Sequence, residues 1–385
     1  MKRLFLILFV LTVVFAVSVP AFGITSAAEN AEVDSSAKSA YLMDYDTGTV
    51  IYAKRENERL PIASMTKIMT SLLVFEAVDG GKLTYDTQIT VSANAASMGG
   101  SQVFLDADSV HSVENLLKTV VVASANDSSV ALAEAVAGSE QAFVQLMNSR
   151  AKEIGLQNTN FTNCTGLPAV NAYSSAKDVS IMLKLLLSHG KYFELAKVWL
   201  EDYAHPDGRI TTITNTNKLV RFYNGCDAGK TGYTSEALFC LAASAKRGDM
   251  RLICTVIGEQ NSKKRFADVS NMFNYAFASY ENKILFAKAQ GIENTIEVVK
   301  GKKSTVAAGP ASNISAFVRK GSESNAEVII NLPDKIKAPI NTGDKIGTAS
   351  VVVDGVVVNE IDIIALEDIG KASFFDSIKK ICGNW

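Results

Sequence analysis

The stretch Pro61-Ile62-Ala63-Ser64-Met65-Thr66-Lys67-Ile68-Met69-Thr70 joins a Ser-x-x-Lys spacing to the start of a helical pattern. From Ser64 to Val78, apolar residues recur at steps of three and four, and Gly80-Gly81 follows, which predicts a helix that starts at Ser64. A spacing of three places the Ser64 hydroxyl and the Lys67 ammonium on one helix face. A desolvated lysine can accept the proton of a serine, so this pair is a candidate nucleophile and base.

The Ser-x-x-Lys spacing alone is weak evidence, because chance supplies it elsewhere in the chain. It also occurs at Ser35/Lys38, Ser149/Lys152, Ser174/Lys177, Ser188/Lys191 and Ser377/Lys380. Only the pair at Ser64 follows a proline and opens a long apolar helix, where the helix N-terminus favours developing negative charge.

Two further short motifs follow along the chain. Ser124-Ala125-Asn126 comes after an apolar helical run and can present a hydroxyl and an amide to a cleft, whereas the similar Ser92-Ala93-Asn94 follows a polar stretch. Lys230-Thr231-Gly232 is the only Lys-Thr-Gly in the chain. On an edge strand its lysine and threonine could bind an anionic group, and its glycine would allow close backbone approach.

The order of predicted elements indicates an α+β fold followed by a small all-β domain. A hairpin is expected over 41–52, helices over 113–154 and 179–187, two strands joined near Gly248, and a helix over 266–280. Strands from both ends of this region would form one antiparallel sheet with a helical block inserted. From about residue 283 to 364, short Val/Ile runs alternate with Gly, Asn, Asp and Pro, which is typical of β-strands.

The two ends of the chain carry targeting patterns. Lys2 and Arg3 precede an apolar run and then small residues, which predicts a secretory signal peptide over 1–28; an uncleaved membrane anchor is the alternative. The last residues place Phe374, Ile378, Ile381 and Trp385 on one helix face, so residues 368–385 are predicted to be an amphipathic helix that lies on a membrane surface. A tail that docks on the β domain is the alternative. The expected domains between these ends are 29–282 and 283–367.

The composition excludes some classes of function. A formal net charge of −2 and the lack of basic runs argue against a nucleic-acid binder. The five cysteines are odd in number and lack metal-ligand spacing, so we expect no metal or other cofactor and mostly buried thiols.

The three motifs together resemble those of the low-molecular-weight penicillin-binding proteins of the D-alanyl-D-alanine carboxypeptidase type. The resemblance covers roughly residues 38 to 282 and includes Asn163-Cys164-Thr165-Gly166-Leu167 and Asn215-Thr216-Asn217-Lys218-Leu219. It implies an exported enzyme that acts on peptidoglycan stem peptides ending in D-Ala-D-Ala and that β-lactams acylate. The implied catalytic residues are Ser64, Lys67 and Ser124, and the implied substrate-binding residues are Asn126, Lys230, Thr231, Gly232 and Arg265.

Some features depart from the family pattern or leave alternatives open. Asp227-Ala228-Gly229 precedes the Lys-Thr-Gly where the family usually has Asp-Gly and an aliphatic residue, and Cys164 is unexpected in its loop. A β-lactamase would add a Glu-x-x-Leu-Asn, and the nearest match, starting at Glu153, ends in Gln157. A non-catalytic sensor domain on the same fold is the second alternative. Arg265 could also belong to a solvated basic cluster with its lysine neighbours.

Overall fold

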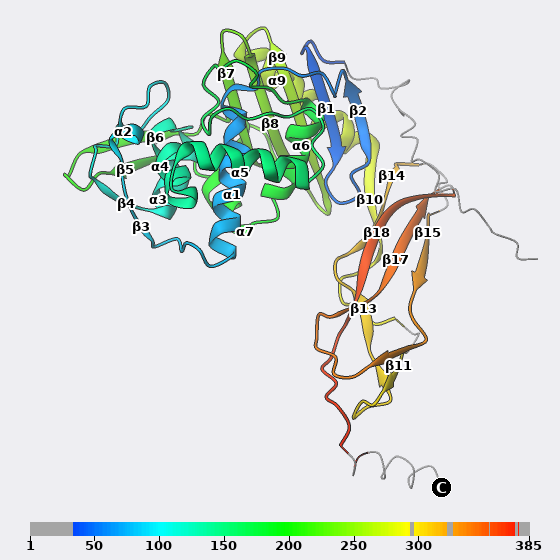
Figure 1. The fold of residues 1–385 in the computed structure, drawn as a ribbon. Helices are drawn as coiled ribbons and strands as arrows, with labels where there is room; N and C mark the ends of the chain where they lie inside the picture. The colour runs from blue at the N-terminus through cyan, green and yellow to red at the C-terminus, as the bar shows by residue number, and fades with distance from the viewer. Residues whose placement is uncertain (1–33, 293–295, 322–325, 354, 374–375, 377–385) are drawn as a thin grey trace, which may run out of the picture.

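The computed structural model describes residues 34–292, 296–321, 326–353, 355–373 and 376. Two units follow one another along the chain: a larger unit of helices around a sheet, and below it in Figure 1 a narrower unit built of strands. The helix α9 (Ser262–Ser279) runs directly into β10 (Tyr280–Phe286), the first strand of the second unit.

A five-stranded antiparallel sheet forms the centre of the larger unit, with the strand order β2-β1-β9-β8-β7. The first two strands are β1 (Ser39–Asp44) and β2 (Val50–Lys54). The other three are β7 (Cys226–Thr234), β8 (Leu238–Arg247) and β9 (Met250–Glu259). Strands from both ends of this unit therefore share one sheet, as predicted, and the Lys-Thr-Gly strand β7 lies at its edge.

Each face of the sheet supports its own hydrophobic core. Alternating residues such as Met43 and Ile253 pack with the inserted helices, while Leu42 and Cys254 pack against α9 on the other face. The inserted helices are α1 (Lys67–Asp79), α3 (Val113–Val122), α4 (Asn126–Ala137), α5 (Glu140–Glu153), α6 (Ala176–Leu186) and α7 (Gly190–Ala196). The continuous helical stretch expected over 113–154 is thus three helices. The chain breaks at Ser124, whose φ is +64°, and at Gly138, whose φ is +82°.

Several short elements were not predicted from the sequence. They are α2 (Ala93–Ala96), α8 (Leu219–Phe222) and two hairpins, one of β3 (Gln88–Thr90) with β4 (Val110–Ser112) and one of β5 (Leu200–Ala204) with β6 (Ile210–Thr214). These segments bury only one or two side chains each, so their apolar pattern is too short to indicate a structure.

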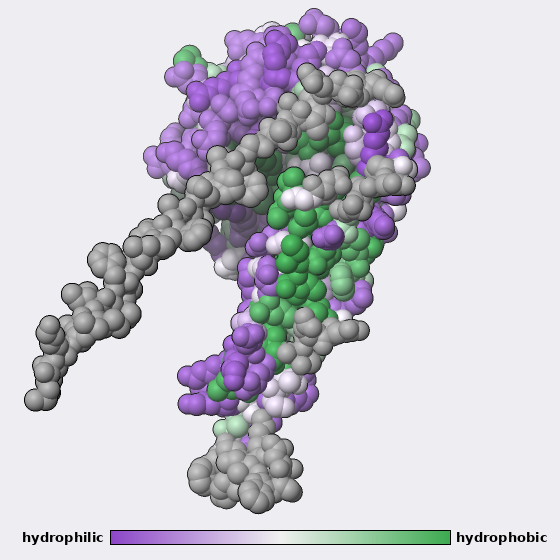
Figure 2. Space-filling view, turned by 90° about the vertical axis from the view of Figure 1, so that its right-hand side faces the viewer, coloured by the Kyte–Doolittle hydropathy of each residue, from purple (hydrophilic) through white to green (hydrophobic). Residues whose placement is uncertain are grey.

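The second unit is all β, as predicted. Its four-stranded sheet has the order β13-β18-β17-β15, with β13 (Ala308–Pro310), β18 (Val356–Ala365), β17 (Lys345–Val353) and β15 (Ala326–Asn331). Strand β14 (Ile314–Arg319) pairs with β10, and β12 (Thr305–Val306), β11 (Ile296–Val299) and β16 (Lys335–Lys337) form a third sheet. Apolar surface runs down the side of this unit that Figure 2 shows, and Ile329, Val356 and Val357 are among its exposed large hydrophobic residues.

The predicted signal peptide lies outside the described residues, as do residues 374, 375 and 377–385 of the predicted amphipathic tail. The helix predicted to begin at residue 368 is wrong for 368–373, because Ile369 is buried and pairs with Ile340 and Lys371 pairs with Gly301 in isolated β-bridges of the second unit. Within the described part of the chain, no helix combines the length and the apolar character needed to cross a bilayer. Four cysteines, Cys164, Cys226, Cys240 and Cys254, are described, and all four are buried free thiols, as the sequence indicated.

Candidate active site

Ser64 and Lys67 lie at the junction of a short 3-10 turn, Ala63–Thr66, and α1. The helix predicted from Ser64 therefore begins with this tighter turn, which still brings the two side chains together. The Lys67 Nζ is 3.2 Å from the Ser64 Oγ, and it also donates to the Asn126 Oδ1 and to the Thr165 carbonyl, each at 2.6 Å.

The Lys67 side chain is fully buried, and burial lowers its pKa to about 7. Desolvation penalises the ammonium form, since no full countercharge contacts the amine directly. The Asp127 carboxylate acts in the opposite direction, from farther away. At neutral pH a large fraction of Lys67 is thus the neutral amine, which can accept a proton from Ser64.

Ser124 occupies the break between α3 and α4, where its positive φ turns the chain sharply. Its side chain is 3% exposed, and its hydroxyl has no hydrogen-bond partner within the part of the chain that the structure describes. Two residues later Asn126 begins α4, and its Nδ2 donates to the Gly99 carbonyl at 2.6 Å while its Oδ1 accepts from Lys67. The break therefore places a buried hydroxyl without a partner two residues before the Asn126 amide that binds Lys67.

Lys230 extends from the edge strand β7 and is 3% exposed. Its Nζ donates to the Thr231 carbonyl at 3.1 Å. Burial lowers the Lys230 pKa well below its usual value, and the like charges of Lys67 and Arg265 lower it further. Three basic side chains thus lie near one another, and an anionic ligand bound there would stabilise their protonated forms.

Two glycines allow other segments to approach the Ser64 turn closely. A Cβ added to Gly232 would lie 2.5 Å from the Ile62 carbonyl oxygen, and one added to Gly166 would lie 2.0 Å from the Ala63 carbonyl oxygen. Both distances are far below van der Waals contact. The Lys-Thr-Gly strand and the Gly166 loop therefore pack against the two residues that precede Ser64 only because both glycine positions lack a side chain.

Arg265 is buried beneath the same strand, although its neighbours Lys263 and Lys264 are exposed. Its Nη1 donates to the carbonyls of Gly232 and Cys240, at 3.3 and 3.2 Å, and burial lowers its pKa to about 10. The alternative of a solvated basic cluster is thus wrong for Arg265. Its Nε has no partner among the described residues.

The chance copies of the motifs have structural roles. The Ser174 hydroxyl is buried against the Thr159 hydroxyl at 2.8 Å, and the Ser92 hydroxyl caps α2 by accepting from the Ala95 N–H at 3.0 Å. Glu153, the nearest match to a β-lactamase deacylation residue, ends α5 with its side chain 63% exposed and paired with Arg150. None of these groups takes part in the network around Lys67.

Two acceptors in this network were missed by the sequence reasoning because they are backbone carbonyls. The Thr165 carbonyl binds Lys67, and the Gly99 carbonyl binds Asn126. A partial signal for the first exists at Asn163, whose side chain accepts from the N–H groups of Thr165 and Gly166 at 3.1 and 2.6 Å. Such Asn-x-x-Gly turns can be recognised in a sequence, but the direction of one carbonyl cannot.

Comparison with known proteins finds matches to both units of the chain. The sequence profile of the family described as D-alanyl-D-alanine carboxypeptidase matches residues 25–261, and that of the penicillin-binding protein 5 C-terminal domain matches residues 280–371. The chain is 42% identical to the D-alanyl-D-alanine carboxypeptidase DacF of Bacillus subtilis, over 100% of this chain and 99% of that one. It is 32% identical to the carboxypeptidase DacC of Escherichia coli, over 93% and 90% of the two chains.

A solved structure shows the same fold. Penicillin binding protein 5 from Haemophilus influenzae superposes with a TM-score of 0.70 at 30% identity, over 88% of this chain and 98% of that one. The protein is accordingly a serine-type D-alanyl-D-alanine carboxypeptidase, and penicillin binding is typical of its relatives. The chain belongs to the D-alanyl-D-alanine carboxypeptidase family of low-molecular-weight penicillin-binding proteins.

Proposed function

We propose that Ser64 is the nucleophile and Lys67 the general base of this carboxypeptidase. The neutral Lys67 amine takes the hydroxyl proton as the Ser64 Oγ attacks the carbonyl carbon between two terminal D-alanines. The observation that carries this proposal is the buried Nζ at 3.2 Å from the Ser64 Oγ, with a pKa lowered to about 7. Backbone N–H groups of Ser64 and of the residue after Gly232 would hold the oxyanion.

Ser124 is proposed to carry a proton to the nitrogen of the leaving D-alanine. Its buried hydroxyl without a partner in the described chain supports this role, because a group that relays protons must be free to change donor and acceptor. Once D-alanine leaves, the peptide remains as an ester on the Ser64 Oγ. Water then attacks this ester, and the proton that it loses returns through Lys67 to the serine.

The remaining residues are proposed to bind the substrate, a peptidoglycan stem peptide. Asn126 would hold the peptide backbone, and Lys230 and Thr231 the terminal carboxylate, with Gly232 giving room for the chain. Their support is the buried Lys230 on β7, which lies near the basic side chains of Lys67 and Arg265, and the close approach of β7 to the Ser64 turn. A β-lactam would enter the same place and acylate Ser64, and mass mapping of a penicillin adduct to the peptide that contains Ser64 tests this assignment.

The pH dependence of acylation follows from the lowered pKa of Lys67. The neutral amine is the reactive form, so its fraction falls as the pH drops below about 7. We expect the rate of penicillin labelling to fall about tenfold per pH unit well below pH 7 and to level off above it. The rate can be measured between pH 5 and 9 with a fluorescent penicillin, in reactions quenched at successive times. A rate that is flat across the range, or that rises only near pH 10, would contradict the role of Lys67.

We propose that Arg265 contributes to the binding of the D-alanine carboxylate. Arg265→Ala should slow peptide hydrolysis more than penicillin labelling, because the proposed partner of Arg265 is the carboxylate of the terminal D-alanine, a residue that penicillin lacks. Lys264→Ala is the matched control, since its exposed side chain is one residue away. Equal loss of both activities would instead indicate that Arg265 only supports β7 through the Gly232 carbonyl. Retention of both activities would also count against the proposal.

We also propose that the enzyme acts outside the cytoplasm, after removal of residues 1–28. Its first unit ends with α9, and its all-β unit begins with β10, three residues before the predicted boundary at 283. In this proposal residues 368–373 stay paired with the β unit, and the tail beyond Ser373 attaches the protein to the membrane surface as an amphipathic helix. Ending the chain at Ser373 should release the protein into the soluble cell fraction and leave its thermal midpoint and its hydrolysis of soluble peptide unchanged. This end point keeps the hydrogen bond from the Ala372 N–H to the Lys300 carbonyl at 2.8 Å.

Cell fractionation and thermal unfolding of the two forms decide between the alternatives for the tail. A shortened protein that stays with the membrane contradicts the anchor. A full-length protein that is already soluble, and that loses several degrees of stability on truncation, supports a tail that docks on the β unit.

A further inference from the structure

A buried carboxylate lies directly beside the proposed substrate-binding residue Asn126. Asp127 is the second residue of α4, and its side chain is fully buried. Within the described residues Asp127 forms no ion pair with a cationic side chain. A buried charge without a countercharge is costly unless backbone donors satisfy it, so its hydrogen bonds show what it holds.

The hydrogen-bond partners of Asp127 are backbone N–H groups, two of which belong to a neighbouring loop, residues 99–105. One carboxylate oxygen accepts from the N–H groups of Val103 and Leu105, both at 3.1 Å, and the other accepts from Ser128 at 2.8 Å. Between the two loop donors lies Phe104, whose φ is +63° and whose side chain is 56% exposed. A left-handed backbone is unfavourable for phenylalanine, so the carboxylate holds a turn that the sequence itself resists.

The other end of the same loop holds Asn126. The Ser101 carbonyl accepts from the Asn126 backbone N–H at 2.7 Å, and the Gly99 carbonyl accepts from its Nδ2 at 2.6 Å. These bonds fix the amide so that its Oδ1 faces Lys67. One stretch of backbone, residues 99–105, is therefore hydrogen-bonded to Asp127 at one end and to Asn126 at the other, and Asn126 is in turn hydrogen-bonded to Lys67.

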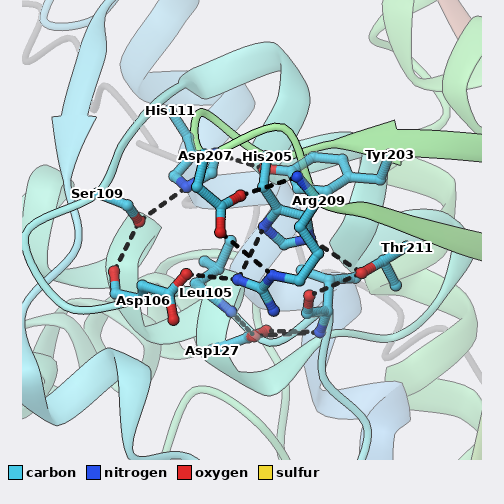
Figure 3. Close-up of polar contacts among 11 residues, drawn as sticks. Leu105, Asp106, Ser109, His111, Asp127, Tyr203, His205, Asp207, Arg209 and Thr211 are labelled. Atoms are coloured by element: carbon cyan, nitrogen blue, oxygen red, sulfur yellow. Dashed lines mark hydrogen bonds and ion pairs between the residues drawn. The ribbon is translucent and has the colours of Figure 1, made fainter.

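A polar cluster fastens the outer side of this loop to the β5–β6 hairpin (Figure 3). Arg209 of the hairpin pairs with Asp106, and the Thr211 hydroxyl donates to the Val103 carbonyl at 3.4 Å. Tyr203 bonds to His111 at 2.6 Å between the hydroxyl and the Nδ1. The hairpin thus contacts the outer side of the loop and the residue that follows it, and Asp127 binds the inner side of the loop.

We propose that Asp127 is a positioning residue whose carboxylate holds residues 99–105 in the conformation that aims Asn126 at Lys67. This inference rests on the proposed roles of Lys67 and Asn126. Asp127 also acts on Lys67 through its charge, which favours the ammonium form. Burial raises the pKa of the nearby Cys164 thiol well above its usual value, so that thiol stays neutral and Asp127 supplies the negative charge.

Asp127→Asn tests this proposal with two readouts. The amide has one acceptor oxygen and no charge, so the loop loses a partner and Asn126 loses its orientation. We expect penicillin labelling to slow by roughly tenfold to 10²-fold, the scale of a misplaced active-site group. The acid limb of its pH profile should move to lower pH, because removing a nearby anion disfavours the protonated Lys67. Rates are scaled to the final labelled amount, which counts folded enzyme.

Asp44→Asn is the matched control for burial and backbone bonding. Asp44 is also fully buried, and its carboxylate accepts from the Thr47 N–H at 2.7 Å in the turn between β1 and β2. We expect this variant to lose stability but to keep the labelling rate and the pH profile of the parent. If Asp127→Asn labels like the parent, or slows without any shift of its profile, the proposal is wrong.

A second pair of variants tests the loop even if Asp127→Asn does not fold. Gly100 and Gly81 have similar positive φ values, +82° and +72°, so alanine strains both backbones alike. A Cβ on Gly100 would lie 2.8 Å from the Asn126 Nδ2, whereas one on Gly81 would meet nothing within 4 Å. Gly100→Ala should label several-fold more slowly than Gly81→Ala, and equal rates would overturn the proposal. Lys67→Arg, measured alongside, reports separately on the proposed role of Lys67.

Discussion

Replacing Ser64 with alanine should abolish penicillin labelling and D-alanine release while leaving the fold intact. The Oγ is the atom that forms the ester, and no other hydroxyl in the described structure lies at hydrogen-bond distance from the Lys67 amine. Removal of a serine nucleophile costs on the order of 10⁶-fold in turnover in serine peptidases. Ser64 is partly exposed, so the loss of one hydroxyl should change the free energy of unfolding little.

Ser174→Ala is the matched control for this experiment. Ser174 has the same Ser-x-x-Lys spacing but is buried, with its hydroxyl bonded to Thr159. Its alanine variant should therefore lose some stability and still become labelled at the parental rate. Normal labelling of Ser64→Ala would refute Ser64 as the nucleophile.

Replacing Lys67 should have the second largest effect. Lys67→Ala removes the base, and general-base catalysis is worth roughly 10²-fold or more, so acylation should slow by at least that factor. Lys67→Arg is the sharper variant, since arginine keeps the positive charge but stays protonated at any pH of interest. Both variants should acylate slowly, measured as the rate of fluorescent penicillin labelling against the folded fraction.

Lys152→Ala provides the control for loss of a lysine from a Ser-x-x-Lys sequence. Lys152 is exposed on α5, and its removal should leave acylation unchanged. A Lys67→Arg protein with the parental rate would mean that another group accepts the proton. The buried Lys230, whose pKa is also lowered, would then be the residue to replace next.

Much of the fold could be predicted because its elements carry long patterns. The helix after Ser64, the β8–β9 hairpin and α9 each bury a continuous apolar face, and tertiary packing did not change them. The region 113–154 could not be divided correctly, because Ser124 breaks the helix through a left-handed backbone that no propensity indicates. The β5–β6 hairpin was missed because its few buried residues give too short a pattern.

The residues of the candidate site likewise fall into those that the sequence could identify and those that it could not. Ser64, Lys67, Ser124 and Lys230 could be selected because motif spacing and helix position agree. In the structure Lys67 contacts Ser64 and Asn126, and Lys230 lies near Lys67. The Thr165 and Gly99 carbonyls could not, since any residue supplies a carbonyl and only the fold aims it. Asp127 was visible in the sequence next to Asn126, but its role depends on loop contacts with distant Val103 and Leu105.

The most direct test is to incubate the protein and Ser64→Ala with a peptide that ends in D-Ala-D-Ala, and to follow free D-alanine and peptide mass together. Mass spectrometry of the protein, quenched early, would detect an acyl group on the peptide that contains Ser64. The parent should release one D-alanine per peptide through an adduct at Ser64, and the variant should do neither. An unchanged peptide, an adduct on another residue, or D-alanine release by Ser64→Ala would contradict the acyl-enzyme on Ser64.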